Sequence, residues 1–507
     1  MRTLTLFLLP VLAWAWQERP KLPPETQALV DGALAAPPEL GADILLWLVD
    51  RGRIPAKEQR LELIEQSFEI AAQAKFPYPE TAAVGAAGNT DSSPGIRRSA
   101  VGDRFSTLGL RCRAVRAALA LDKARALALF RRIALGPFPP LSCDDALAPA
   151  LSVYYETLRE VASSAFSPKD RQEERHLELI EAAVRNVAIP RQLEPVARLL
   201  LGFPLSLERS TDFAGALAAS LKQMSVDPRS FASATYEFSQ AVLGLSRSLR
   251  AGGISTVPLA AAAATYLTRH LRGEVCAETV DPKTGGAEMR RTVELVLNDG
   301  VLKPSGATDI APLNFEELKP KSVAGRAKFS DYWQEGRSRE IMAQYKRLRF
   351  GTREQQDEYN RRERRKDGMA HFLPEELRRT REWETQAREF LNELDRWTLH
   401  HDEPEIDFFH ELCLQYSALL AIIPAGPLYD SVLQTYISFL KTSPMEREDP
   451  PEWLVHVKRL FTITDATPEQ KEHVRAEVRK SGSLTMGLYA EIDRLEAPLN
   501  PRTSSGS

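Results

Sequence analysis

The chain lacks the short motifs that mark the commonest nucleotide, metal and hydrolase sites. It contains no Gly-x-Gly-x-x-Gly or Gly-Lys-Ser/Thr loop, no Gly-x-Ser-x-Gly elbow and no Cys-x-x-Cys pair. A dinucleotide or phosphate-loop site, a serine-hydrolase nucleophile, and a thiol-held zinc or haem are therefore not indicated. From motifs alone we predict no catalytic residue, no cofactor and no metal site.

An excess of charge of one sign is also missing. The 66 basic and 69 acidic side chains leave a net charge of −3 over 507 residues. No strong field is available to attract nucleic acid or an anionic membrane surface. We therefore predict no nucleic-acid partner for this protein.

Long hydrophobic runs are absent after the N-terminus. The best candidates, residues 257–267 and 418–429, are shorter than the run of about 20 apolar residues that a spanning helix needs. Pro424 and Gly426 also interrupt the second run. We predict no membrane span.

Cysteine is scarce: the chain has four, too few for a fold built on disulfides. Cys112 and Cys413 each lie on an apolar stripe with helical spacing, which favours buried thiols. Cys143 and Cys276 lie in loops at helix ends, where the backbone can adjust to disulfide geometry. If a disulfide forms, we expect it to join Cys143 to Cys276; four thiols without a disulfide are the alternative.

The first fifteen residues have the pattern of an export signal. Arg2 precedes a short apolar run, and Ala13 and Ala15 then provide the small-x-small pattern that signal peptidase accepts. The run is too short to span a bilayer. We predict a signal peptide at residues 1–15, a mature chain that begins at Trp16, and a secreted or periplasmic location.

Helical periodicity dominates the rest of the chain, and strand patterns are nearly absent. Apolar residues recur at spacings of three and four, as in Leu61, Ile64 and Phe68, and Pro or Gly separates most periodic segments. The five residues at 61–65 also recur at 177–181. The pattern predicts an all-α fold of stacked antiparallel helix pairs, an α-solenoid-like array, with a second helical C-terminal domain.

Composition divides the chain into five segments. Residues 276–326 are crowded with Pro and Gly and interrupt the helical pattern, so we expect them to connect two helical regions. The predicted segments are the signal peptide 1–15, an N-terminal helical repeat-like array 16–275, an irregular connection 276–326, a C-terminal helical domain 327–498 and a polar tail 499–507.

Three local predictions are specific. Residues 75–102 are rich in Gly, Pro, Ser and Ala and are expected to form a long loop, which one helix over 103–121 follows. Residues 289–297 have a helical apolar face, and Gly300 is expected to stop that helix. The alternative at this point is a β-hairpin that turns at Asp299 and Gly300.

The densest polar cluster lies at residues 400–411, with three histidines and five acidic residues. Asp407 and His410 are three residues apart, which is the spacing of a metal-binding pair on one helix face. Such pairs also arise by chance at this composition. We interpret residues 402–411 as a solvated turn before a helix start, with a metal or acid–base site as the alternative. Other histidines, such as His456, are scattered.

Positive charge is concentrated in one segment. Residues 337–382 contain 14 basic and 9 acidic side chains, a local net charge of +5, centred on residues 361–366. Aromatic residues, among them Tyr345 and Trp383, lie within or beside the segment. Guanidinium groups and rings together could bind a polyanion. The alternative is a solvent-exposed helix with ion pairs along its surface.

Architecture and the lack of catalytic motifs favour a binding protein over an enzyme. The leading hypothesis is an exported helical scaffold that binds a protein or peptide partner. The first alternative is a helical-toroid enzyme, a hydrolase or lyase that uses carboxylates or a metal at residues 402–411. The second is a polyanion- or envelope-binding protein that acts through residues 337–382.

Overall fold

The computed structural model describes part of the chain, namely residues 21–84, 92–280, 286–318, 320–325, 327, 336–362, 373–400, 403–462 and 467–496. The predicted signal peptide, the new N-terminus at Trp16 and the polar tail at 499–507 lie outside these residues. Within the described chain, strands are limited to four segments of three residues each, and the other regular elements are helices. The all-α prediction is confirmed.

The first thirteen helices form the N-terminal part of the structure. They are α1 (Pro24–Ala35), α2 (Pro38–Asp50), α3 (Lys57–Ile70), α4 (Ser93–Phe105), α5 (Thr107–Leu119), α6 (Lys123–Phe130), α7 (Ser152–Ser164), α8 (Pro168–Gln172), α9 (Arg175–Arg185), α10 (Leu193–Gly202), α11 (Leu207–Gln223), α12 (Ser230–Ala251) and α13 (Val257–Arg272). Two short strands, β1 (Glu80–Ala82) and β2 (Leu147–Pro149), pair antiparallel.

The middle and C-terminal helices follow. They are α14 (Ala277–Val280), α15 (Gly286–Leu297), α16 (Lys303–Ser305), α17 (Gly336–Phe350), α18 (Arg353–Arg362), α19 (Glu375–Arg378), α20 (Arg381–Asp395), α21 (Glu405–Leu420), α22 (Pro427–Thr442), α23 (Met445–Glu448), α24 (Pro450–Phe461), α25 (Pro468–Lys480) and α26 (Leu484–Glu496). The strands β3 (Glu274–Cys276) and β4 (Lys321–Val323) pair in parallel.

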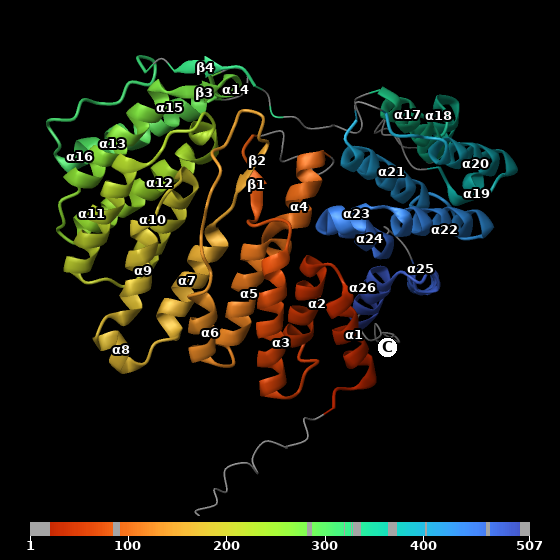
Figure 1. The fold of residues 1–507 in the computed structure, drawn as a ribbon. Coiled ribbons are helices and arrows are strands. Elements are labelled where there is room, and N and C mark those ends of the chain that lie inside the picture. The colour runs from red at the N-terminus through yellow and green to blue at the C-terminus, as the bar shows by residue number, and fades with distance from the viewer. Residues whose placement is uncertain are drawn as a thin grey trace, which may run out of the picture.

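The N-terminal helices pack next to one another in chain order. Helices α3, α5, α7, α9, α11 and α13 each contact the next in this series, and α10, α12 and α15 form a second series. Figure 1 shows this progression from red to green. The contacts use apolar stripes such as Leu108, Cys112 and Val115 on α5, all of which are buried. The finer expectation of a solenoid array stays a prediction.

The last helices return to the first ones. Helix α24 packs against α4 and α2, and α26 packs against α1, as Figure 1 shows for the blue and red ends of the chain. One continuous cluster of buried hydrophobic side chains extends from Leu29 in α1 to Ile492 in α26. The two ends of the sequence therefore share a core, and polar side chains buried there come from both ends.

Residues 75–102 and 103–121 differ from the prediction. The expected loop contains β1 and the start of α4, and the expected single helix is two helices that break at Ser106. Ser92 and Ser106 cap α4 and α5, each by accepting a hydrogen bond from the backbone N–H three residues further along. Ser92, in the expected loop, is therefore a helix cap, and Ser106 starts a new helix inside the expected single one. Helix α1 is also present, in a segment where no helix was expected.

The segment around Gly300 is helical, and the expected stop there is wrong. Helix α15 continues into a π-helix over Asn298–Leu302 and then into α16, which ends at Gly306 with a φ of 74°. A Cβ atom at Gly300 would lie 2.6 Å from Cδ1 of Leu243 on α12. A side chain at position 300 would require Leu243 to move, so the glycine accompanies a close approach of two helices and not a chain turn.

A disulfide joins Cys143 to Cys276, the pair preferred from the sequence, with the two Cα atoms 5.4 Å apart. Gly325, in the loop after β4, approaches this bond so closely that a Cβ atom there would lie 2.6 Å from Cβ of Cys143. Cys112 and Cys413 are buried thiols on α5 and α21.

Arg229 fixes the loop that carries Cys143. Its fully buried guanidinium donates hydrogen bonds to the carbonyl oxygens of Ser142 and Cys143 and forms an ion pair with Glu278 on α14. The loop before β2 is therefore held against the segment that follows α13 by both a covalent bond and a buried cation.

The two apolar runs noted in the sequence belong to ordinary packed helices. Residues 257–267 lie in α13, and residues 418–429 end α21 and begin α22. Over the described parts of the chain, no helix combines the length and apolar character needed to cross a membrane.

Candidate functional site

The polar cluster at residues 402–411 divides between surface and core. His401 and Asp402 lie outside the described residues, and Glu405 is exposed in the first turn of α21. His410 and Glu411, one turn further along, are buried. The interpretation as a solvated turn is therefore correct for Glu405 and wrong for His410 and Glu411, because α21 turns that face into the core.

His410 joins two side chains of α24 in a buried relay. Its Nε2 lies 2.6 Å from Oε2 of Glu452, and its Nδ1 lies 2.7 Å from Nε2 of His456. Both histidines are fully buried, and Glu452 is nearly so. Glu452 and His456 are four residues apart, so one face of α24 presents both groups to His410.

Burial, followed by the neighbouring His410 and Arg459, holds the pKa of His456 well below its usual value. Its ring is therefore neutral near pH 7. A neutral imidazole has one N–H donor and one acceptor nitrogen. His410 donates from Nε2 to the carboxylate of Glu452, and its Nδ1 shares one hydrogen with Nε2 of His456.

Three carboxyl groups follow one another at the start of α21. Glu403, Asp407 and Glu411 are spaced by four residues, which places them along one side of the helix. Burial raises the pKa of Asp407, against the opposing effect of His410. Burial also raises the pKa of Glu411 to about 7, with Ser338 opposing the shift and the other two acids reinforcing it. Glu411 therefore exchanges a proton near neutral pH.

Among the described residues, which leave out His401 and Asp402 of this cluster, no group of three or more His, Cys, Asp and Glu side chains is placed to hold a metal ion.

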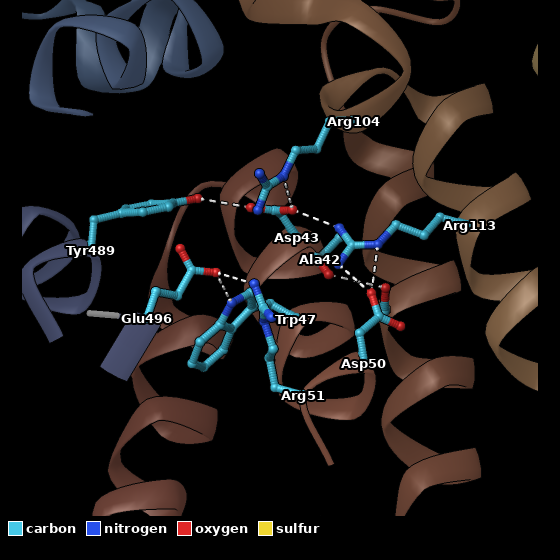
Figure 2. A network of polar contacts seen from close by, with 10 residues as sticks. Ala42, Asp43, Trp47, Asp50, Arg51, Arg104, Arg113, Tyr489 and Glu496 are labelled. Carbon is cyan, nitrogen blue, oxygen red and sulfur yellow. Dashed lines mark hydrogen bonds and ion pairs between the residues drawn. The ribbon is translucent and has the colours of Figure 1, made fainter. Parts of the chain in front are cut away.

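A second polar network surrounds Asp43 on α2, where the two ends of the chain meet (Figure 2). Asp43 is buried, and its Oδ1 accepts hydrogen bonds of 2.7 Å from both Arg104 on α4 and Arg113 on α5. Tyr489 on α26 donates to Oδ2 at 3.3 Å. Arg113 also donates from Nε and Nη2 to Asp50, at 3.1 and 2.7 Å.

The network neutralises a carboxylate that burial alone would protonate. Burial raises the pKa of Asp43, but Arg104 and Arg113 outweigh burial, so the pKa lies below its usual value. Asp43 is thus ionised at neutral pH, and its two arginine partners come from helices that flank α2. The carboxylate orders three helices around one buried charge.

The third candidate site is a groove between α17 and α20, in the region of the basic stretch. Part of the stretch, residues 363–372, lies outside the described residues. The groove has a volume of about 720 Å³. Its floor is apolar, with Leu348, Leu373, Trp383 and Phe390. The indole N–H of Trp383 donates to the carbonyl oxygen of Leu348 at 2.9 Å, which holds α17 and α20 together along the floor.

The rim of the groove carries amides, hydroxyls and acids. Three glutamines and two threonines lie along it: Gln344, Gln355, Gln386, Thr352 and Thr380. Its charged lining is one arginine, Arg347, and three glutamates, Glu382, Glu389 and Glu393. The described lining is therefore net negative, although the surrounding sequence is basic.

Sequence reasoning identifies His410 but not its partners. Glu452 and His456 are 42 and 46 residues away, and their signal is only a shared helix face. Asp43 has a clearer signal, because it is the single acid in the apolar run 40–49. A lone acid in such a run predicts a buried cation, although it does not say which one.

Searches against family models, curated proteins and solved structures find no match for this chain.

Proposed function

We propose that this protein is an exported helical binding protein that takes a peptide segment of a partner along the groove between α17 and α20. The observation that carries the proposal is the lining of that groove, with its apolar floor and its rim of amides, hydroxyls and acids. Peptide sites combine these features, since the floor takes side-chain anchors and the rim groups fix the backbone.

The size of the groove suits a short peptide. Glu382, Gln386, Glu389 and Glu393 line it over the 12 residues 382–393 of α20, which is a length of about 16 Å at the rise of an α-helix. An extended segment of about five residues covers this distance. The three rim glutamates favour a segment with Lys or Arg beside its apolar anchors.

The alternatives have less support. A polyanion would meet one arginine and three glutamates in the described lining of the groove, and like charges across an interface repel. An enzyme at residues 402–411 would need its acid–base groups to reach a substrate. His410 and His456 are fully buried in the packed core.

The test is binding of fluorescein-labelled hexapeptides in which two apolar anchors are flanked by lysines, measured by fluorescence polarisation. We expect Glu389→Lys to weaken binding by about tenfold, because it places a positive charge on the rim facing a basic ligand. Glu384→Lys is the matched control: Glu384 is exposed on the same helix and does not line the groove. Equal affinities of the two variants, or no binding by any peptide, would refute the proposal.

Export has its own test. N-terminal sequencing of the processed protein should give Trp16 as the first residue, and a mature product that still begins at Met1 would contradict export through this signal.

A further inference from the structure

A second hollow, independent of the groove, lies where α2, α5 and α26 meet. Its volume is about 490 Å³, within the range of small-ligand sites. Four arginines line it: Arg51 on α2, Arg104 on α4, and Arg113 and Arg116 on α5. Figure 2 shows three of them, and all three guanidinium groups lie next to carboxylates.

The guanidinium groups have more donors than these carboxylates use. Each arginine carries five N–H donors. Within the described chain, Arg104 uses Nε on Asp43, and Arg51 uses Nη2 on Glu496. Arg116 donates from Nη2 to Glu156, whereas its buried Nε makes no hydrogen bond, although it lies 3.2 Å from Oε2 of Glu160. Donors of Arg51, Arg104 and Arg116 therefore stay available to a bound molecule.

The charges around the hollow are nearly balanced. Its lining contains four arginines and two acids, Asp50 and Glu496. Three further acids, Asp43, Glu156 and Glu160, form ion pairs with these arginines. The hollow therefore attracts a ligand through its unused N–H donors and not through an excess of positive charge.

One carboxylate of the chain itself, that of Glu496, already binds at the edge of this hollow. Glu496 comes from the last helix, and its Oε1 accepts hydrogen bonds from the indole N–H of Trp47 at 2.7 Å and from Arg51 at 2.9 Å. A carboxylate from a distant part of the chain is thus held by one guanidinium group and one indole donor. Guanidinium groups match planar carboxylates well, since they can donate two parallel hydrogen bonds.

We propose that the hollow lined by Arg51, Arg104, Arg113 and Arg116 binds a carboxylate ligand. The ligand's carboxylate accepts hydrogen bonds from N–H groups of these arginines that the internal carboxylates do not use. Trp47 and Val153 provide the apolar wall for the carbon skeleton. Two sources offer this chemistry: a small dicarboxylic acid, or the acidic side chain of a partner peptide.

The experiment is isothermal titration calorimetry on the purified chain with three probes. Succinate represents the small acid, an N-acetylated and C-amidated Asp-Glu-Asp-Glu peptide represents the acidic segment, and inorganic phosphate tests the preference for a carboxylate. We expect at least one carboxylate probe to bind with a dissociation constant below about 1 mM. Binding of succinate alone assigns a small acid, and binding of the peptide alone assigns a protein segment.

The double variant Arg51→Gln/Arg116→Gln should weaken that binding by about tenfold or more, because two charge-assisted donors are lost. Both arginines form ion pairs at the surface, so the fold should tolerate their replacement. The matched control is Arg125→Gln on α6, which also has two glutamate partners but lies outside the hollow. Far-ultraviolet circular dichroism checks that both variants are folded.

Three outcomes would overturn the proposal. These are no binding of either carboxylate probe, tighter binding of phosphate than of both, or unchanged carboxylate binding in the folded double variant. Glu389→Lys, in the α17–α20 groove, should leave this binding unchanged, which separates a failure here from a failure of the peptide proposal.

Discussion

Helices α2 and α21 each bury an acidic group, but the surroundings stabilise the two groups differently. On α2, Asp43 stays ionised because Arg104 and Arg113 hold its pKa below the usual value, against the effect of burial. On α21, burial dominates and raises the pKa of Glu411 to about 7. Fixed cations offset the cost of burying the charged Asp43, whereas Glu411 avoids that cost by taking up a proton.

The difference shows that burial does not decide the state of a carboxyl group by itself. Two guanidinium groups at 2.7 Å provide enough attraction to outweigh desolvation. The neighbours of Glu411 include Glu403 and Asp407, which add repulsion to desolvation. We therefore expect the α2 site to respond to removal of a charge and the α21 site to respond to pH.

The largest effect is expected for Asp43→Asn, which removes the charge that Arg104 and Arg113 share. We expect the free energy of unfolding to fall by about 2–4 kcal/mol. The loss stays below that of a fully enclosed pair because both arginines reach solvent. Urea denaturation at pH 7 measures it. Asp50→Asn is the control, because Asp50 also binds Arg113 but is 44% exposed, and it should cost under about 1 kcal/mol. Equal losses would mean that burial of Asp43 is irrelevant.

The next effect is pH-dependent and concerns Glu411→Gln. The folded pKa of about 7 is above the ordinary value of 4.5. The contribution of Glu411 to stability is therefore full below about pH 4.5 and is lost as pH rises through about 7. At pH 8.5 the variant should be more stable than the wild type by about 2–3 kcal/mol, and at pH 4.5 the two should be close.

Urea denaturation at pH 4.5, 7 and 8.5 checks this. The exposed Glu405→Gln, from the same helix, should show the pH dependence of the wild type. If the difference in free energy of unfolding between Glu411→Gln and the wild type is the same at all three pH values, Glu411 does not take up a proton in this range.

The smallest effect is expected for His410→Ala. It leaves Glu452 buried without its 2.6 Å partner, and an unsatisfied buried acceptor costs about 1–3 kcal/mol. His473→Ala is the control, since His473 contacts Asp430 in a 40%-exposed pair and should cost less than about 1 kcal/mol. Elemental analysis is the second readout: we expect metal content to be the same before and after the substitution. Stoichiometric metal that disappears with His410 would show that the relay is a metal site.

Much of the helical structure could be predicted from sequence, and the reason is local. The spacing of Leu61, Ile64 and Phe68 predicted a helix, and these residues are buried on α3. Period-3.6 apolar patterns and Pro or Gly punctuation are contained within each segment, so no distant residue is needed to recognise them. One error occurred where a local signal has two meanings: Ser92 belongs to a Ser-rich segment that suggested a loop, but it caps α4.

The candidate sites could be predicted only in part. His410 belongs to a recognisable polar cluster, but the pattern suggested a solvated turn because it does not show which face of α21 is covered. The basic stretch suggested a polyanion, but the described groove within it is lined by three glutamates and one arginine. The sequence gives the net charge of a segment, but the fold determines which charged side chains line the same groove.

The sequence by itself determined that this chain is helical and which faces of its helices are apolar. The tertiary structure alone decided which faces meet. Asp43 finds Arg104, Arg113 and Tyr489 across 61, 70 and 446 residues, and His410 finds His456 across 46. A helical period predicts that one face of a helix is buried. Which other helix covers that face depends on how all the apolar faces pack together.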